Sequence, residues 1–166
     1  MNKLTPAQII KTGALYGLYT CIAYIVYFLI MRIAGMATVV ELRFVNYIFL
    51  MFAAYYASRR AEEYKHWRLK YLQAFIVIFV TGASSFLFFS AFIFAYSVFD
   101  PIILNTFTEI FPGSSSMGRF SAPVLIASEG ISFSSIISLG MAFFVQEYAG
   151  HPRKNSGEVI SYGEQS

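Results

Sequence analysis

Charged side chains are scarce in this chain, and so are the residue types that most enzymes use for chemistry. Only 13% of its 166 residues are charged, while 57% are hydrophobic. A typical soluble domain has about a quarter of its residues charged. The single cysteine, Cys21, excludes an intrachain disulfide, and two histidines and one aspartate, Asp100, provide no cluster for a metal. The composition therefore argues against a soluble enzyme or a metalloprotein.

Catalytic motifs are missing as well. The sequence contains no His-Glu-x-x-His, no Gly-x-Ser-x-Gly and no phosphate-binding loop. Both histidines, His66 and His151, fall in polar segments, so the apolar segments hold no histidine to act as a base. We predict no catalytic residue, no metal and no cofactor, and we expect that the protein is not an enzyme.

Long apolar runs dominate what is present. The run from Tyr71 to Phe99 carries no charge, and as a helix it would be about 43 Å long, more than the ~30 Å hydrocarbon core of a bilayer. With three further runs it predicts an all-α integral membrane protein, a bundle of four transmembrane helices over about residues 10–34, 39–58, 71–99 and 122–145. These spans form one membrane domain, 1–146, and residues 147–166 are expected to be a disordered cytoplasmic tail.

Capping signals set the expected helix ends. Thr5-Pro6-Ala7-Gln8 is a capping box that predicts a helix beginning at Pro6, and Ser121 with Pro123 opens the last span. Apolar residues between Ile102 and Phe111 recur at helical spacing, which predicts a short interfacial helix between spans three and four. The polar segment 59–70 is expected to form a tight turn. The first run also admits a signal peptide as an alternative, cleaved near Ala37.

Small residues indicate how the spans pack. Gly13 and Gly17 form a small-xxx-small pair, which we interpret as a packing face within the chain, with a dimer seam as the alternative. Five small residues, 81–85, should let neighbouring helices approach the third span closely or let it bend. In the fourth span we expect packing through a serine face made up of Ser128, Ser132, Ser135 and Ala142.

Basic residues set the expected orientation. Nine of them lie on one side of the predicted bundle: Lys3, Lys11, Arg59, Arg60, Lys65, Arg68, Lys70, Arg153 and Lys154. The other side has three, which are Arg32, Arg43 and Arg119. The positive-inside rule therefore places both termini in the cytoplasm. Because the basic residues lie in short loops, we expect no nucleic-acid partner; the expected partners are the lipid bilayer and either a second copy or another membrane protein.

The two ends of the third span resemble a known family. The span begins with Tyr71-Leu72-Gln73-Ala74-Phe75 and ends with Phe99-Asp100-Pro101. An aromatic-Gln-Ala-Phe start and an aromatic-Asp-Pro exit make the chain similar to a family of small bacterial four-span membrane proteins whose domain has no assigned function. The resemblance implies four spans and a bacterial inner membrane. It implies no activity and no functional residue.

Three polar residues in or near the spans are candidates for a binding site: Glu129, Arg43 and Asn46. Glu129 is the only charge in the fourth span, eight residues past Ser121 and so about 6–12 Å inside the apolar layer. Arg43 and Asn46 should lie in the same leaflet. Each also has a simpler role, because Arg43 can reach the interface and Asn46 can bond to a neighbouring helix.

Two functions fit these residues. In the first, which we favour, the protein has a structural or interaction role without catalysis, and Glu129 is a hydrogen-bonded acid that holds the bundle together. In the second, it forms an oligomeric carrier or channel in which Glu129 binds a proton or cation, with Arg43 or Asn46 as neighbours. Replacing Glu129 with glutamine separates the two, since a carrier would lose its flux while its fold stayed intact.

Overall fold

The computed structural model describes residues 6–36, 44–65, 70–99 and 120–148. Four helices make up nearly all of this part: α1 (Pro6–Ile33), α2 (Phe44–Lys65), α3 (Tyr71–Phe99) and α5 (Ser121–Tyr148). No strand occurs in the described residues, and the predicted all-α fold is confirmed. The predicted interfacial helix, Arg43 and most of the predicted tail lie outside the described residues.

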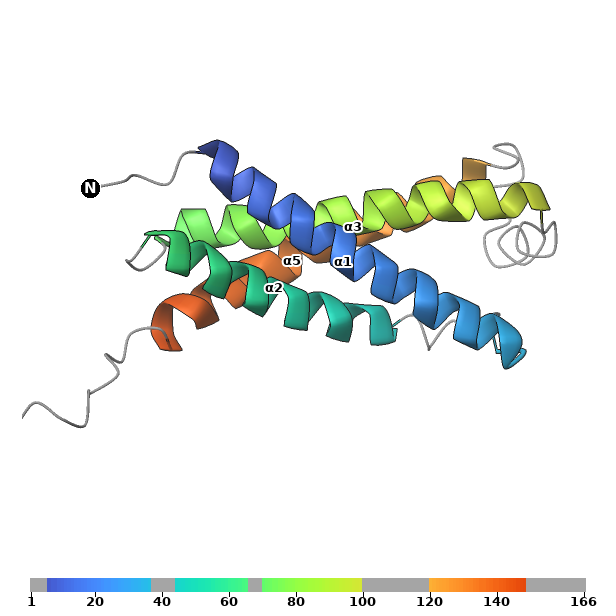
Figure 1. Ribbon diagram of the computed structural model, residues 1–166, viewed down its shortest axis with the longest axis horizontal. Coiled ribbons are helices and arrows are strands. Elements are labelled where there is room, and N and C mark those ends of the chain that lie inside the picture. The colour runs from blue at the N-terminus through green and yellow to red at the C-terminus, as the bar shows by residue number, and fades with distance from the viewer. Residues whose placement is uncertain (1–5, 37–43, 66–69, 100–119, 149–166) are drawn as a thin grey trace, which may run out of the picture.

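The third helix, α3, lies at the centre of the bundle. Successive helices run in alternating directions, so the start of α1 and the end of α5 lie at the same end of the protein (Figure 1). α1 and α5 each pack extensively along α3. The backbones of α1 and α5 do not come into contact with each other. Half of the most apolar window of α3 is buried inside the protein, against 22% for α1 and α5. α3 is therefore the common packing partner, and its neighbours present much of their apolar surface outward.

Three of the described helices, α1, α3 and α5, are long and apolar enough to cross a membrane. The remaining helix, α2, is less apolar, because it contains Asn46, three tyrosines before its charged end and two arginines. Only residues 44–58 of the predicted second span are described, and a helix of that length is about 22 Å long, shorter than the hydrocarbon core. The structure thus supports three spans by length and composition.

The helices begin and end where the sequence predicted, except that α2 and α5 extend beyond the ends of their predicted spans. α1 begins at Pro6 and α3 covers Tyr71–Phe99, as predicted. α2 continues past Ser58 to Lys65, so the part of the expected turn up to that residue is helical instead. Arginine, alanine, glutamate and lysine are good helix formers, and Arg59 pairs with Glu62 one turn later, at 3.6 Å. α5 likewise runs on to Tyr148.

Glycines let α1 approach α3 closely. A Cβ atom on Gly13 would lie 2.9 Å from the Cβ of Val80, and one on Gly17 would lie 2.8 Å from the carbonyl oxygen of Thr81. Such distances are well below ordinary van der Waals contact, so only glycine fits at either position. The two glycines contact α3 of their own chain, and the predicted intrachain packing is confirmed. On another face of α3, Gly82 meets Ser134 of α5.

The packing face of α5 differs from the predicted one. The predicted face was wrong at Ser128 and Ser132, which are exposed, and Ser135 is only partly buried, whereas Ala142 is buried as predicted. The hydroxyl of Ser132 donates to the carbonyl of Ser128 at 2.9 Å, so its hydrogen bond is made within the helix and it can face lipid. Side-chain size decides the contact instead. Four buried positions recur every four residues, Gly130, Ser134, Ser138 and Ala142, and Ala122, Pro123 and Val145 are buried near the two ends of the helix.

Candidate functional site

Glu129, the acid predicted to lie inside the membrane, is bonded to a residue of another helix. The hydroxyl of Tyr47 on α2 donates to Oε1 of Glu129 on α5 at 2.7 Å. Both side chains are partly buried. α2 and α5 share far fewer contacts than α3 shares with either α1 or α5. A short hydrogen bond to a carboxyl group is therefore a principal link between two helices that otherwise touch little.

Aromatic packing holds both partners of this hydrogen bond. The ring of Tyr47 lies 4.5 Å from that of Phe133 on α5 and 6.0 Å from that of Phe86 on α3, measured between centroids. Phe86 is only 5% exposed, and its ring fills the space beside Gly130 where a Cβ would otherwise sit. Gly130 follows Glu129 directly in the sequence. The contact of Phe86 with Gly130 therefore fixes how α5 is rotated about its axis, and this rotation directs the carboxyl group of Glu129 toward α2.

Asn46, the second predicted site residue, lies next to Tyr47 on α2 but does not bond to Glu129. Its Oδ1 atom is buried and has no hydrogen-bond partner in the described part of the protein. The third predicted residue, Arg43, is outside the described residues. The structure therefore joins Glu129 to Tyr47, which the sequence did not single out, and leaves Asn46 beside this pair with an unused acceptor.

A second buried polar atom without a hydrogen-bond partner belongs to Tyr24 of α1. Tyr24 of α1 is fully buried and packs on Phe86 at 5.3 Å between ring centroids. Its hydroxyl lies close to Ser85, yet Ser85 donates to the carbonyl of Gly82 at 2.8 Å, and the Tyr24 hydroxyl makes no hydrogen bond of good geometry. A buried hydroxyl without a partner is costly, so this position is a place where water or a proton could be accommodated.

The chemistry open to this arrangement is narrow. One carboxyl group with a tyrosine donor can hold a proton, bind a cation weakly or fasten two helices. Within the described residues there is no group of histidine, cysteine, aspartate or glutamate side chains that could hold a metal ion.

Tyr47 could have been identified from the sequence as a partner of Glu129, because both residues have the same predicted depth in the membrane. Tyr47 lies eight residues past the start of the predicted second span at 39, and Glu129 lies eight residues past Ser121. The helices α2 and α5 run in the same direction, so equal distances from the predicted starts of their spans imply similar positions along the bundle. Comparison with known proteins adds nothing to this picture: no family model matches the chain, and no curated protein or solved structure matches it.

Proposed function

We propose that the chain is a multi-pass membrane protein with a structural or accessory role and no catalysis, in which Glu129 fastens α2 to the rest of the bundle. The single observation behind this proposal is the 2.7 Å hydrogen bond from Tyr47 to Glu129. Acids within membrane spans are costly and usually face protein, where a hydrogen bond lowers the cost. Here the donor comes from the helix that has the fewest other contacts with the bundle.

The proposal also includes the number of spans, the membrane in which the protein resides and the orientation of its termini. α2 together with the residues before it makes a fourth span, the protein resides in a bacterial inner membrane, and both termini face the cytoplasm. The resemblance of the third span to the bacterial four-span family and the excess of basic residues on one side support this arrangement.

Reporter fusions test the orientation. A phosphatase that is active only outside the cytoplasm should be inactive when fused after Ser166 and active when inserted near Gly35. A cytoplasmic fluorescent reporter should give the reverse pattern. Phosphatase activity at both Gly35 and the carboxyl terminus would contradict the proposed four-span topology, since an even number of spans would then separate the two sites.

A second candidate function is an oligomeric carrier or channel for a proton or small cation. It is favoured by one specific observation, the two buried polar atoms without partners, Asn46 Oδ1 and the Tyr24 hydroxyl, around the core that also holds Tyr47. Such atoms are rare in folded proteins and are often satisfied by water or an ion. Glu129 would bind the proton or cation in this function, and a second copy of the chain would complete the pathway.

A double-mutant cycle tests the proposed fastening role. Tyr47→Phe removes the donor and Glu129→Leu removes the acceptor, so their effects on the free energy of unfolding should be coupled by about 1 kcal/mol. The measurement is reversible unfolding in mixed detergent micelles, followed by circular dichroism. Tyr56→Phe is the matched control on the same helix, because this ring is 59% exposed and should lose no stability. Strictly additive effects of the first two substitutions would contradict the proposal.

Glu129→Gln distinguishes the two functions. Glutamine keeps an oxygen that accepts the hydrogen bond from Tyr47, so the fold should stay intact under either function. In proteoliposomes with a pH-sensitive dye, the structural role predicts the same background leak for the wild type and the variant. A proton or cation flux in the wild type that disappears in Glu129→Gln would replace the first proposal with the second.

A further inference from the structure

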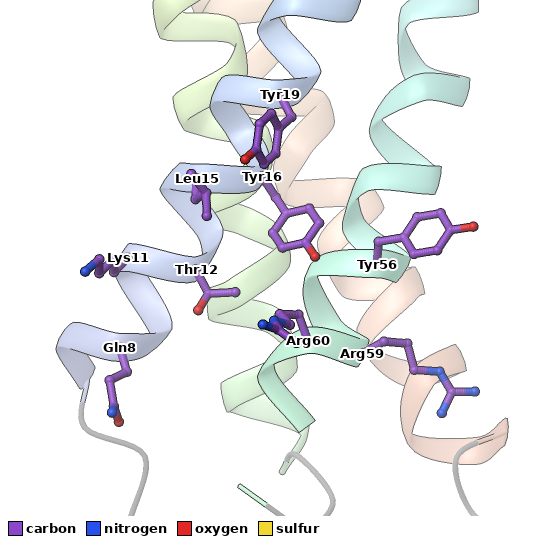
Figure 2. A pocket seen from close by; sticks show the side chains of 9 residues that line it. All are labelled: Gln8, Lys11, Thr12, Leu15, Tyr16, Tyr19, Tyr56, Arg59 and Arg60. Atoms are coloured by element: carbon purple, nitrogen blue, oxygen red, sulfur yellow. The ribbon is translucent and has the colours of Figure 1, made fainter. Parts of the chain in front are cut away.

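A cavity lies between α1 and α2 at the end of the bundle where α1 begins (Figure 2). Its volume is about 600 Å³, within the usual range for small-ligand pockets. The nine residues that line it come from the first half of α1 and the second half of α2: Gln8, Lys11, Thr12, Leu15, Tyr16, Tyr19, Tyr56, Arg59 and Arg60. The Tyr47–Glu129 pair is not part of it, and the two sites are separate.

The lining of this cavity carries positive charge only. Lys11, Arg59 and Arg60 contribute three cations, and no acidic side chain lines the cavity in the described part of the chain. In Figure 2 Arg60 projects between the two helices, whereas Lys11 and Arg59 lie toward opposite sides. Arg60 thus lies between the helices, and one further lining cation lies on each side of it.

Arg59 interacts with two residues of its own helix, Tyr55 and Glu62, and still contributes positive charge to the cavity. Its Nε donates to the Tyr55 hydroxyl at 3.2 Å, and its guanidinium lies 5.3 Å from the centroid of that ring. The hydrogen bond that Arg59 donates to Tyr55 raises the pKa of Arg59, which therefore stays charged. Glu62 at 3.6 Å offsets part of that charge. Arg59 therefore remains one of the three cations that line the cavity, together with Lys11 and Arg60.

The lining changes character with depth. Gln8, Lys11 and Arg60 lie toward the helix ends, whereas Leu15 and Tyr19 lie one to two turns further along α1, about 6–12 Å deeper. Tyr16 points from α1 toward Arg60 in the space between the helices (Figure 2). The cavity is therefore cationic at its outer end and aromatic or aliphatic at its inner end. A ligand that matches it is anionic at one end and apolar at the other.

We propose that this cavity binds the headgroup of an anionic phospholipid, with the phosphate near Arg60 and Lys11 and an acyl chain along Leu15 and Tyr19. Basic pockets between transmembrane helices are a recognised means of binding anionic lipid headgroups. Three cations in one concave site differ from basic residues scattered along an interface, which merely anchor a helix end. The residues involved are independent of Glu129, so this inference stands or falls separately from the proposed function.

Native mass spectrometry of the full-length protein tests the site. The protein is taken from nanodiscs of phosphatidylcholine with increasing amounts of phosphatidylglycerol, and the lipids that stay bound are counted. The wild type should retain phosphatidylglycerol in preference to phosphatidylcholine. Lys11→Gln and Arg60→Gln should each weaken this retention about fivefold, the loss expected for one cation near a phosphate. Arg60→Lys keeps the charge and should retain most of the binding.

The controls decide between this site and general surface charge. Lys70→Gln removes an exposed cation near the same end of the bundle, at a position that does not line the cavity, and should leave retention unchanged. An equal loss in Lys70→Gln and Lys11→Gln would overturn the proposal, and so would equal retention of the two lipids by the wild type. Glycerol phosphate has the anion without the chains and should compete poorly. Binding as tight as that of the lipid would show a site for soluble phosphates instead.

Discussion

Replacing Gly17 with leucine should drive α1 away from α3 and lower the stability of the bundle by about 3 kcal/mol or more. Even a single added carbon would overlap the side chain of Ser84 and lie 2.8 Å from the backbone oxygen of Thr81. The backbone oxygen cannot rotate aside, so the helices must separate. In a membrane, helix association depends on such close packing, because lipid tails satisfy apolar side chains as well as protein does.

A matched control for this substitution lies on α5. Gly140 is exposed, and a Cβ built on it meets no atom within 4 Å. Gly140→Leu should therefore be neutral or slightly stabilising, since leucine is the better helix former. Unfolding in mixed micelles measures both variants. Equal stability of the two leucine variants would show that the close contact of α1 with α3 is absent in the folded protein.

Replacing Phe86 with alanine should cost about 3 kcal/mol and loosen the hydrogen bond between Tyr47 and Glu129. The ring of Phe86 contacts Tyr24 of α1 and Tyr47 of α2, and it fills the space beside Gly130 of α5. Its removal leaves a cavity where α3 meets all three neighbouring helices. Exchange of the Tyr47 hydroxyl proton, followed by NMR in micelles, should become faster.

The fit between Phe86 and Gly130 can be tested on its own. Gly130→Ala in the wild type should destabilise the bundle by about 1–3 kcal/mol, because the new methyl group overlaps the ring. In the Phe86→Ala background that methyl group has room, so the same substitution should cost less, with a coupling of about 1 kcal/mol or more. Additive costs would mean that the ring does not rest on Gly130.

The membrane character of the chain could be predicted from local sequence, and for a clear reason. Apolarity over a whole helix and caps at its ends act on each segment separately, so Pro6 and the range Tyr71–Phe99 could be identified without knowing what either contacts. The end of α2 was misjudged. Charge after Ser58 was taken to end the helix, but charge ends only the apolar part, and residues with high helix propensity continue it to Lys65.

The contacts between helices were harder to predict. On a water-soluble helix the buried face is the apolar one, but here lipid-facing and protein-facing positions are both apolar, so hydrophobic periodicity carries little information. The serine face of α5 seemed polar enough to be buried. Serine hydroxyls bond to their own backbone on both faces, in exposed Ser132 as in buried Ser134, so polarity does not decide which face packs. The face that packs has small side chains at four-residue spacing, including Gly130 and Ser134.

The sequence by itself determined that the protein is helical, that α1, α3 and α5 are long and apolar enough to span a membrane, that Gly13 and Gly17 form a packing face, and that Glu129 is a polar exception in its span. The tertiary structure alone decided that Glu129 meets Tyr47 and that three cations gather at one cavity. Length, apolarity and caps are properties of single segments. Which side chains meet depends on how each helix is rotated about its axis, and that rotation is set by the fit of small residues such as Gly130 against large ones such as Phe86.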